Sequence, residues 1–188
     1  MSIIIENLKE AINGESNAKR KYELYAEQAE KENHREIAHL FRATAKAESY
    51  HIKNHLKALS TILKMEVNPD DFVKIKEVDI KNNVKDTNSN LIDAIGGELY
   101  EHKHMYKTFL KNAKRHENDV VELTFDLARK AEKIHAKLYS SFLKKLEKNR
   151  EFETIDIYVC TICGNVELIS APDICKICDH NIRFYEKI

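Results

Sequence analysis

Apolar side chains recur every three or four residues through most of the first 148 positions of the chain. This spacing gathers them on one side of a helix and predicts four long amphipathic helices. We expect these helices over about 3–31, 34–63, 89–114 and 119–148. The same region is rich in Ala, Leu, Glu, Lys and Arg, which are strong helix formers, and poor in Gly and Pro. The pattern therefore predicts a mainly α-helical domain.

The lengths of the connections predict how the helices are arranged. Only a few residues near Asn33 separate the first two helices, and a few near His116 separate the last two, so each pair is antiparallel. About 25 residues, 64–88, lie between the pairs, which is enough chain to run the full length of a bundle. Two hairpins joined by one long crossover predict a ferritin-like four-helix bundle.

The chain changes character after the fourth helix. We expect a bundle over 1–148, a linker over 149–156 and a small metal-binding β domain over 157–188. A domain of about 30 residues is too small to hold a core without a staple. Two Cys-x-x-Cys pairs lie within it, Cys160 with Cys163 and Cys175 with Cys178. Four thiolates at this spacing predict a closed tetrahedral site, and the sequence leaves open whether iron or zinc fills it.

Charge and hydropathy exclude several classes of partner. The chain has 31 basic and 31 acidic residues, which argues against nucleic acid because phosphate binding needs a basic surplus. It has no basic start followed by an apolar run, so we expect no signal peptide, and no stretch long enough to cross a membrane. Without a secretory signal, the paired cysteines favour metal binding in a reducing cytoplasm over disulfides.

Several polar residues fall on the apolar faces of the predicted helices, where a lone charge is costly to bury. They are Glu15, Glu48, His51, Glu98, Glu101, Glu132 and His135. Two Glu-x-x-His pairs are among them, and that spacing places a carboxylate beside an imidazole on one face. Converging carboxylates repel one another unless cations compensate, and mixed carboxylate and imidazole ligands favour iron, zinc or manganese over calcium. The pattern predicts a di-metal carboxylate site in the middle of the bundle.

Three further polar residues share these faces. Tyr22 follows Glu15 by seven positions and Tyr106 follows Glu98 by eight, so each hydroxyl is placed to hydrogen-bond a ligand carboxylate. Plain core packing is the alternative interpretation of both tyrosines. His55 lies one turn beyond His51 and has no Glu three positions before it, so we expect it to support the site or to be a satisfied core histidine.

Taken together, these motifs resemble the rubrerythrin family over nearly the full length of the chain. The segments that carry the resemblance are Gly14-Glu15-Ser16, Ala47–His51, Gly97–Glu101, Ala131–His135 and Tyr158–Gly164, with Ala171-Pro172 before the second cysteine pair. One departure is the second cysteine pair itself, where Lys176 and Asp179 stand in place of the usual Pro and Gly. Asp tolerates a left-handed backbone better than most residues, so the turn is expected to survive.

The resemblance implies a non-haem peroxidase that reduces hydrogen peroxide to water in defence against oxidative stress. In this family a di-iron centre supplies the electrons, and a rubredoxin-like four-cysteine iron restores them, with zinc as the alternative metal at the cysteines. The resemblance implies that Glu48 and Glu132 bridge the two irons. Each iron then takes a further Glu and a His, which are Glu15 with His51 and Glu98 with His135.

The resemblance also implies catalytic roles and partners. Glu101 is expected to be an alternative ligand that exchanges with His51, and Tyr22 and Tyr106 to assist catalysis. Electrons are expected from a rubredoxin or a reductase, linked to NADH through that separate protein. A homodimer is expected, because a cysteine site at one end of a chain can be too far from its own bundle centre. The competing hypotheses are a ferritin-like ferroxidase that handles iron and a non-enzymatic zinc-ribbon adaptor.

Overall fold

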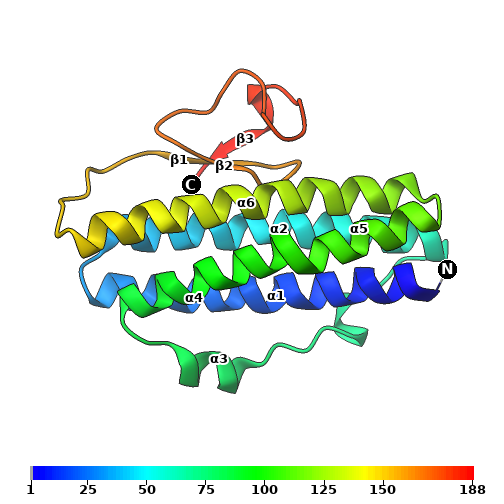
Figure 1. The fold of residues 1–188 in the computed structure, drawn as a ribbon, viewed down its shortest axis with the longest axis horizontal. Helices are drawn as coiled ribbons and strands as arrows, with labels where there is room; N and C mark the ends of the chain where they lie inside the picture. Colours follow the sequence, from blue (N-terminus) through cyan, green and yellow to red (C-terminus); the bar gives the residue numbers. More distant parts are fainter. Residues whose placement is uncertain (1) are drawn as a thin grey trace.

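The computed structural model describes residues 2–188, and Figure 1 shows a long helical bundle with a small sheet along one side. The first, second and fourth of the expected bundle helices are single elements, whereas the third is built from three consecutive segments. The bundle helices are α1 (Ser2–Lys31), α2 (Arg35–Leu63), α4 (Thr87–Tyr100) continued by η2 (Glu101–Met105) and α5 (Tyr106–Arg115), and α6 (Asp119–Glu147). The predicted ferritin-like arrangement of two hairpins and one crossover is confirmed.

Local chemistry sets the ends of these helices. The hairpin turns pass through left-handed residues, Asn33 with φ 64° and Glu117 with φ 50°. Asn118 caps α6 by accepting a 3.1 Å hydrogen bond from the Val121 amide, and Asp86 caps α4 by accepting one of 2.9 Å from the Ser89 amide. Such caps satisfy amides that have no partner inside the helix.

The crossover contains two elements that periodicity does not predict, η1 (Pro69–Asp71) and α3 (Glu77–Asn83). Polar side chains of α1 hold it in place. Asn17 accepts from the Lys76 amide at 2.9 Å and donates to the Lys74 carbonyl at 3.0 Å. Arg20 binds both carboxylate oxygens of Glu77 at 2.8 and 2.9 Å. Helix α3 has seven residues, which are too few to show a helical pattern in the sequence, so the helix is apparent only in the structure.

The third bundle helix is not uniformly α-helical, contrary to the sequence prediction. Its middle segment η2, Glu101–Met105, is a π-helix. Eight α-helical residues overshoot two full turns by about a fifth of a turn. The wider π turn takes up that excess and brings Tyr106 back toward the face that carries Glu98.

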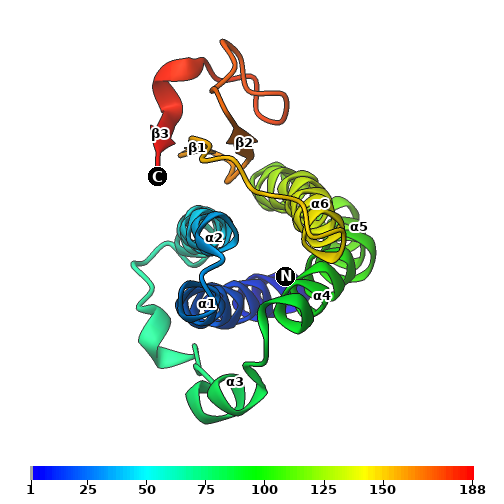
Figure 2. The ribbon, with the colours of Figure 1, turned by 90° about the vertical axis from the view of Figure 1, so that its left-hand side faces the viewer.

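A three-stranded antiparallel sheet ends the chain, made of β1 (Ile157–Cys160), β2 (Val166–Leu168) and β3 (Tyr185–Lys187). The strand order is β2-β1-β3, and η3 (Ile182–Phe184) precedes the last strand. Figure 2, which views the bundle from one end, shows the sheet lying over α2 and α6 on the side opposite α3. The small domain therefore covers the two helices that bear the Glu-x-x-His pairs.

Two apolar clusters fill the bundle, one toward each end. One includes Tyr22, Phe41 and Tyr139, and the other includes Ile12 and Phe125. The acidic and imidazole residues named above lie between them along every helix, and most of them have no solvent exposure. None of the helices within residues 2–188 combines the length and apolarity that a membrane span requires. The fold thus holds a polar layer at mid-bundle between two packed apolar layers.

Candidate metal centre

The structure gathers six of the seven predicted bundle ligands into two adjacent groups. In each group the potential ligand atoms lie within 4.8 Å of one another. The first group is Glu15, Glu48, His51 and Glu132, and the second is Glu48, Glu98, Glu132 and His135. Glu48 and Glu132 belong to both, which is the arrangement that two bridged metal ions need.

The polar atoms of these groups point at common centres and do not pair with one another. His51 Nδ1 lies 2.8 Å from Glu48 Oε2 and 2.9 Å from Glu132 Oε1. His135 Nδ1 lies 2.8 Å from the other Glu132 oxygen. Both imidazole nitrogens and all four of the shared carboxylate oxygens are nonetheless buried without a hydrogen-bond partner. Buried polar atoms are rarely left unsatisfied, so these residues fit a pair of bound cations.

The outer nitrogens of the two histidines fix which ring nitrogen faces the cluster. His51 Nε2 donates to the Cys163 carbonyl at 3.0 Å, and His135 Nε2 donates to the Gly164 carbonyl at 2.9 Å. A carbonyl can only accept, so Nε2 carries a proton and Nδ1 faces the cluster, where its lone pair binds a metal that displaces any proton held there. The chain's own cysteine loop makes both contacts, so the two sites already lie side by side within one chain, and the distance given above as a reason to expect a homodimer does not arise.

Burial and mutual repulsion shift the titration of the cluster. Burial, followed by the charges of Glu48 and Glu132, raises the pKa of Glu15 to about 8. Burial also raises the pKa of Glu98 and of Glu101 well above the usual value. Burial opposes ionisation of Glu132 too, but the charges of His51 and His135 outweigh it and lower the pKa of that carboxyl. Without metal, the site therefore holds protons that cations must displace.

Both predicted tyrosines reach a ligand carboxylate. The Tyr22 hydroxyl donates to Glu98 Oε1 at 2.5 Å, and the Tyr106 hydroxyl donates to Glu15 Oε1. Both side chains are buried. The alternative of plain core packing is therefore incomplete, because each tyrosine packs in the core and also orients one carboxylate.

Glu101 stands apart from the two four-residue groups. It opens the π-helical segment, is 8 % exposed, and leaves its Oε2 atom without a partner. The charge that raises its pKa most, after burial, is that of Glu15, which belongs to the group of His51. Glu101 also lines a cleft of about 870 Å³ between α1, α4 and the crossover. It is therefore the acidic residue of the site that meets an opening to solvent.

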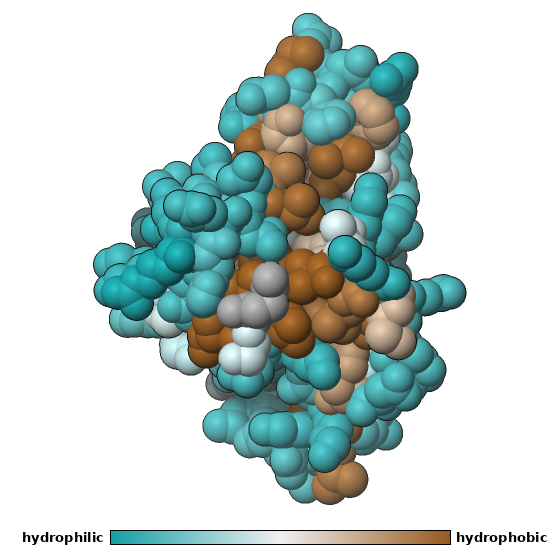
Figure 3. Space-filling view, turned by 90° about the vertical axis from the view of Figure 1, so that its right-hand side faces the viewer, coloured by the Kyte–Doolittle hydropathy of each residue, from teal (hydrophilic) through white to brown (hydrophobic). Residues whose placement is uncertain are grey.

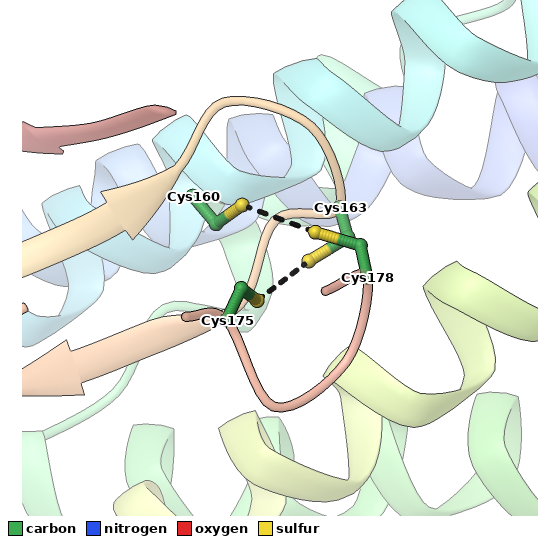
Figure 4. A group of neighbouring side chains, drawn as sticks. All are labelled: Cys160, Cys163, Cys175 and Cys178. Atoms are coloured by element: carbon green, nitrogen blue, oxygen red, sulfur yellow. Dashed lines mark hydrogen bonds between the residues drawn. The ribbon is translucent and has the colours of Figure 1, made fainter. Parts of the chain in front are cut away.

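The four cysteines converge at the edge of the sheet (Figure 4). Cys160 Sγ lies 3.6 Å from Cys178 Sγ, and Cys163 Sγ lies 3.6 Å from Cys175 Sγ, with no disulfide among them. Metal–sulfur bonds of about 2.3 Å in a tetrahedron place sulfur atoms about 3.8 Å apart. The four thiols therefore fit one metal ion. Asp179 adopts the left-handed conformation expected of it, with φ 59°.

Gly164 joins the two sites, and sequence reasoning gave it no role. Its φ is +74°, and a Cβ atom placed on it would lie 2.4 Å from His51 Nε2 and 3.1 Å from the Ala47 carbonyl oxygen. Nearby, Asn54 donates to the Ile162 carbonyl at 2.7 Å. Only glycine lets the cysteine loop lie this close to α2. The Gly that follows the first Cys-x-x-Cys pair was the available signal in the sequence.

Comparisons with known proteins agree with this architecture. The family model described as Rubrerythrin matches residues 6–151. The chain is 37 % identical over 171 residues to Rubrerythrin-2 of Clostridium acetobutylicum, covering 91 % of this chain and 89 % of that protein. It is 32 % identical to nigerythrin of Nitratidesulfovibrio vulgaris, covering 93 % and 81 % of the two chains.

Solved structures resemble the whole molecule, including the small sheet. A structure titled as a mixed-valence state of nigerythrin matches with a TM-score of 0.87 and 27 % identity, covering 98 % of this chain and 86 % of that one. A match of this extent includes both the bundle and the cysteine domain. The sites described above therefore lie in a fold that known proteins share from end to end.

Proposed function

The chain belongs to the rubrerythrin family, and on that premise we propose that it is a non-haem peroxidase that reduces hydrogen peroxide to water. Family membership makes it an oxidoreductase with a di-iron centre and a rubredoxin-like iron site. The observation that supports the peroxidase proposal best is the joining of two sites. The cysteine loop that would hold one iron hydrogen-bonds both histidines that would hold the others.

The bundle residues divide naturally between two irons. Glu48 and Glu132 would bridge them, because both belong to the two groups. Each iron would then take one more carboxylate and one imidazole, Glu15 with His51 and Glu98 with His135. When bound, a pair of ferrous ions would supply the two electrons that hydrogen peroxide needs, with two protons, to become two water molecules.

The remaining polar residues position these ligands and serve the oxidised state. Tyr22 and Tyr106 hold Glu98 and Glu15 by hydrogen bonds. Glu101 is a spare carboxylate beside the position served by His51. Ferric iron is harder than ferrous iron and favours a carboxylate over a neutral imidazole, so Glu101 would be the residue to replace His51 on oxidation. Because Glu101 lines the cleft, peroxide reaches the site on the same side.

With iron bound, the cysteine domain would serve as the relay that restores electrons one at a time. Its loop contacts His51 and His135 directly, which keeps the path between the two sites short. Iron is needed for this role, because zinc does not change oxidation state. A rubredoxin, or a reductase that takes electrons from NADH, supplies the cysteine site from outside, and the protein works in the cytoplasm.

A homodimer remains part of the proposal, although the structure gives it a different basis. Apolar side chains gather at the end of the bundle where α1 and α6 begin and α2 ends (Figure 3). Exposed apolar residues of those segments include Met65 and Leu123, which are 63 % and 60 % exposed. An apolar surface ringed by polar residues is typical of a protein interface. A second copy of the chain would cover it.

Iron storage by a ferritin-like ferroxidase is the competing function and is disfavoured. A storage protein needs neither a spare carboxylate beside a complete ligand set nor an electron carrier docked on the ligand histidines. A zinc-ribbon adaptor is disfavoured because it gives the buried Glu and His cluster no purpose.

Metal content and two rates test the proposal together. Protein made with ample iron should hold about three iron atoms per chain, two in the bundle and one at the cysteines. It should then reduce hydrogen peroxide through many turnovers and should not accumulate a mineral when given excess ferrous iron. Zinc at the cysteines in the native host, or iron loading far beyond the ligand count, would contradict it.

A further inference from the structure

A continuous chain of hydrogen bonds leads from one ligand carboxylate across the bundle. The Tyr106 hydroxyl contacts Glu15 Oε1, and His55 Nε2 lies 2.8 Å from the Tyr106 oxygen. The Thr124 hydroxyl lies 2.9 Å from the other ring nitrogen, His55 Nδ1. Each member comes from a different helix of the bundle: Glu15 from α1, His55 from α2, Tyr106 from α5 and Thr124 from α6. These hydrogen bonds therefore connect all four bundle helices to one ligand, Glu15.

The donors and acceptors in this run of hydrogen bonds can be assigned in only one self-consistent way when Glu15 binds a metal. A ligand carboxylate is ionised and can only accept, so the Tyr106 hydroxyl must donate to it. The Tyr106 oxygen then accepts from His55 Nε2, which must carry the imidazole proton. His55 Nδ1 is left as an acceptor, and the Thr124 hydroxyl donates to it. Burial lowers the pKa of His55 to about 3, so the ring is neutral and has a single N–H to place.

The residues of this hydrogen-bonded network are buried and packed against aromatic side chains. Glu15, His55 and Tyr106 are fully buried, and Thr124 is 7 % exposed. The ring of Phe125 packs against His55 at 5.3 Å and against Tyr106 at 5.8 Å between ring centroids. The Tyr106 hydroxyl, both ring nitrogens of His55 and the Thr124 hydroxyl each take part in a contact of this network, whereas Glu15 Oε2 has no hydrogen-bond partner and is left for a metal. An alternative orientation would leave a buried donor or acceptor unpaired, at a cost of about 1–3 kcal/mol.

The other metal position has a simpler arrangement. Tyr22 donates to Glu98 as Tyr106 donates to Glu15. Aromatic rings, Phe41 at 6.1 Å and Tyr139 at 5.5 Å between centroids, surround Tyr22. Among residues 2–188, the hydrogen bonds of the structure give the Tyr22 hydroxyl no counterpart of His55. The two tyrosines are therefore alike in donating to a ligand carboxylate, but only Tyr106 also has a histidine contact at its hydroxyl among the described residues.

We propose that His55 and Thr124 are positioning residues that fix Tyr106 as a one-way donor to Glu15. They thereby strengthen one metal position, that of Glu15 and His51, and leave the position of Glu98 and His135 unaffected. The proposal rests on the bundle cluster being a di-metal site, but it does not require that the protein reduce peroxide. Hydrogen-bond partners behind a metal ligand commonly change metal affinity by about 10–100-fold.

The test uses zinc, which is diamagnetic, in the full-length protein with ¹⁵N-labelled histidine. The Nδ1 signals of His51 and His135 each report the filling of their own metal position as zinc is titrated. The His55 signals report its tautomer, and a proton on Nε2 is expected in the loaded protein. Thr124→Val removes the hydroxyl with little change in shape and should weaken zinc at the His51 position by about 10-fold.

Matched variants separate positioning from simple packing. Thr124→Ser keeps the hydroxyl and should bind zinc as the wild type does. His55→Gln keeps one donor and one acceptor and should retain most of the affinity, whereas His55→Leu should lose about as much as Tyr106→Phe. Tyr22→Phe should instead weaken the His135 position. Thr124→Val tests the idea without His55→Leu, should that variant fail to fold.

Two results would overturn the proposal. One is a His55 proton on Nδ1 in the zinc-loaded protein. The other is a Thr124→Val variant that binds zinc at both positions as tightly as the wild type, or loses both equally. These outcomes are independent of the peroxidase proposal, which is tested separately by whether the iron-loaded wild type turns over hydrogen peroxide.

Discussion

The bundle cluster and the cysteine site are both buried metal sites, but they are built in opposite ways. The cluster takes its ligands from positions as far apart as Glu15 and His135, on separate helices, and two large apolar layers hold it in shape. The cysteine site takes all four ligands from the short segment between Cys160 and Cys178. Long helices can hold mutually repelling carboxylates in place, whereas a small sheet relies on the metal itself.

This difference in construction fits the different tasks that we propose for the two sites. The cluster has mixed ligands, a spare carboxylate at a cleft and hydrogen-bonded tyrosines, which suit it to bind and transform a substrate. The cysteine site is closed, with three of its four thiols fully buried, which suits it to pass electrons without reacting. The carbonyls of Cys163 and Gly164, which accept hydrogen bonds from His51 and His135, are the contact between the two sites.

Removing one cysteine should break this division of tasks most severely. Cys160→Ser or Cys178→Ser should leave a reduced bundle able to react once with hydrogen peroxide, because the cysteines do not touch peroxide. Steady-state turnover with the electron donor should fall by at least about 100-fold, since the relay is lost. Stopped-flow oxidation and steady-state assays measure the two steps. Unchanged turnover would remove the relay from the account.

Filling the contact between the sites should have the next largest effect. Gly164→Ala introduces a Cβ atom 2.4 Å from His51 Nε2 at a backbone angle that suits glycine, so the loop must move away. We expect electron transfer from the cysteine iron to slow by about 10-fold or more, with both metal sites still filled. Gly96→Ala is the matched control, because nothing lies within 4 Å of its added Cβ. Equal rates in the two variants would contradict the contact's role.

Glu101 tests whether the cluster is more than a set of six ligands. Glu101→Ala should still bind two irons in the bundle, because both four-residue groups remain. It should slow peroxide reduction, since the oxidised site loses its preferred carboxylate, and leave slower oxidation by oxygen comparatively intact. Iron analysis and single-turnover kinetics measure this. The prediction is contradicted if Glu101→Ala reduces peroxide at the wild-type rate and the iron beside His51 stays in place on oxidation. Glu101 would then be only a buried acid.

The smallest expected effect concerns the metal-free bundle. Its Glu15 has a pKa raised from 4.5 to about 8, so between these values the folded chain holds a proton that the unfolded chain releases. The free energy of unfolding should therefore fall as pH rises through this window, by up to about 1.4 kcal/mol per pH unit for one proton. Urea unfolding of metal-free protein at several pH values measures the slope.

Glu15→Gln is the control for that slope. The variant cannot ionise at this position and should show a flatter dependence on pH. Zinc should reverse the trend, because metal binds the deprotonated ligands and stabilises the folded chain more at higher pH. A metal-free wild type that becomes more stable between pH 5 and 8 would show that its cluster is already ionised.

Sequence reasoning was effective where chemistry follows helical periodicity. The Glu-x-x-His pairs lie on apolar faces, so their spacing alone predicts that Glu48, His51, Glu132 and His135 meet in the core. The crossover length predicted which helices are neighbours. The cysteine spacing predicted a four-thiolate site, and the sulfur atoms converge as expected.

Other features depend on tertiary contacts and leave little trace in sequence. The π-helical turn that begins at Glu101 lies in a segment whose composition is that of an ordinary helix, so composition gives no sign of it. The docking of Gly164 on His51 depends on where a small domain comes to rest, which no periodicity determines. The partners of His55 come from α5 and α6, so its role was not apparent from its own helix.

We propose that one chain carries out both peroxide reduction in the bundle and electron return from its own cysteine site. Rapid mixing of fully reduced, three-iron protein with hydrogen peroxide tests it, with the cysteine iron followed by its visible absorption and the bundle irons by Mössbauer spectra. The account predicts that the bundle irons are oxidised first. The cysteine iron should follow in a first-order step whose rate does not change on dilution of the protein. A cysteine iron that stays ferrous while the bundle irons are oxidised, or that reacts with peroxide before them, would contradict it.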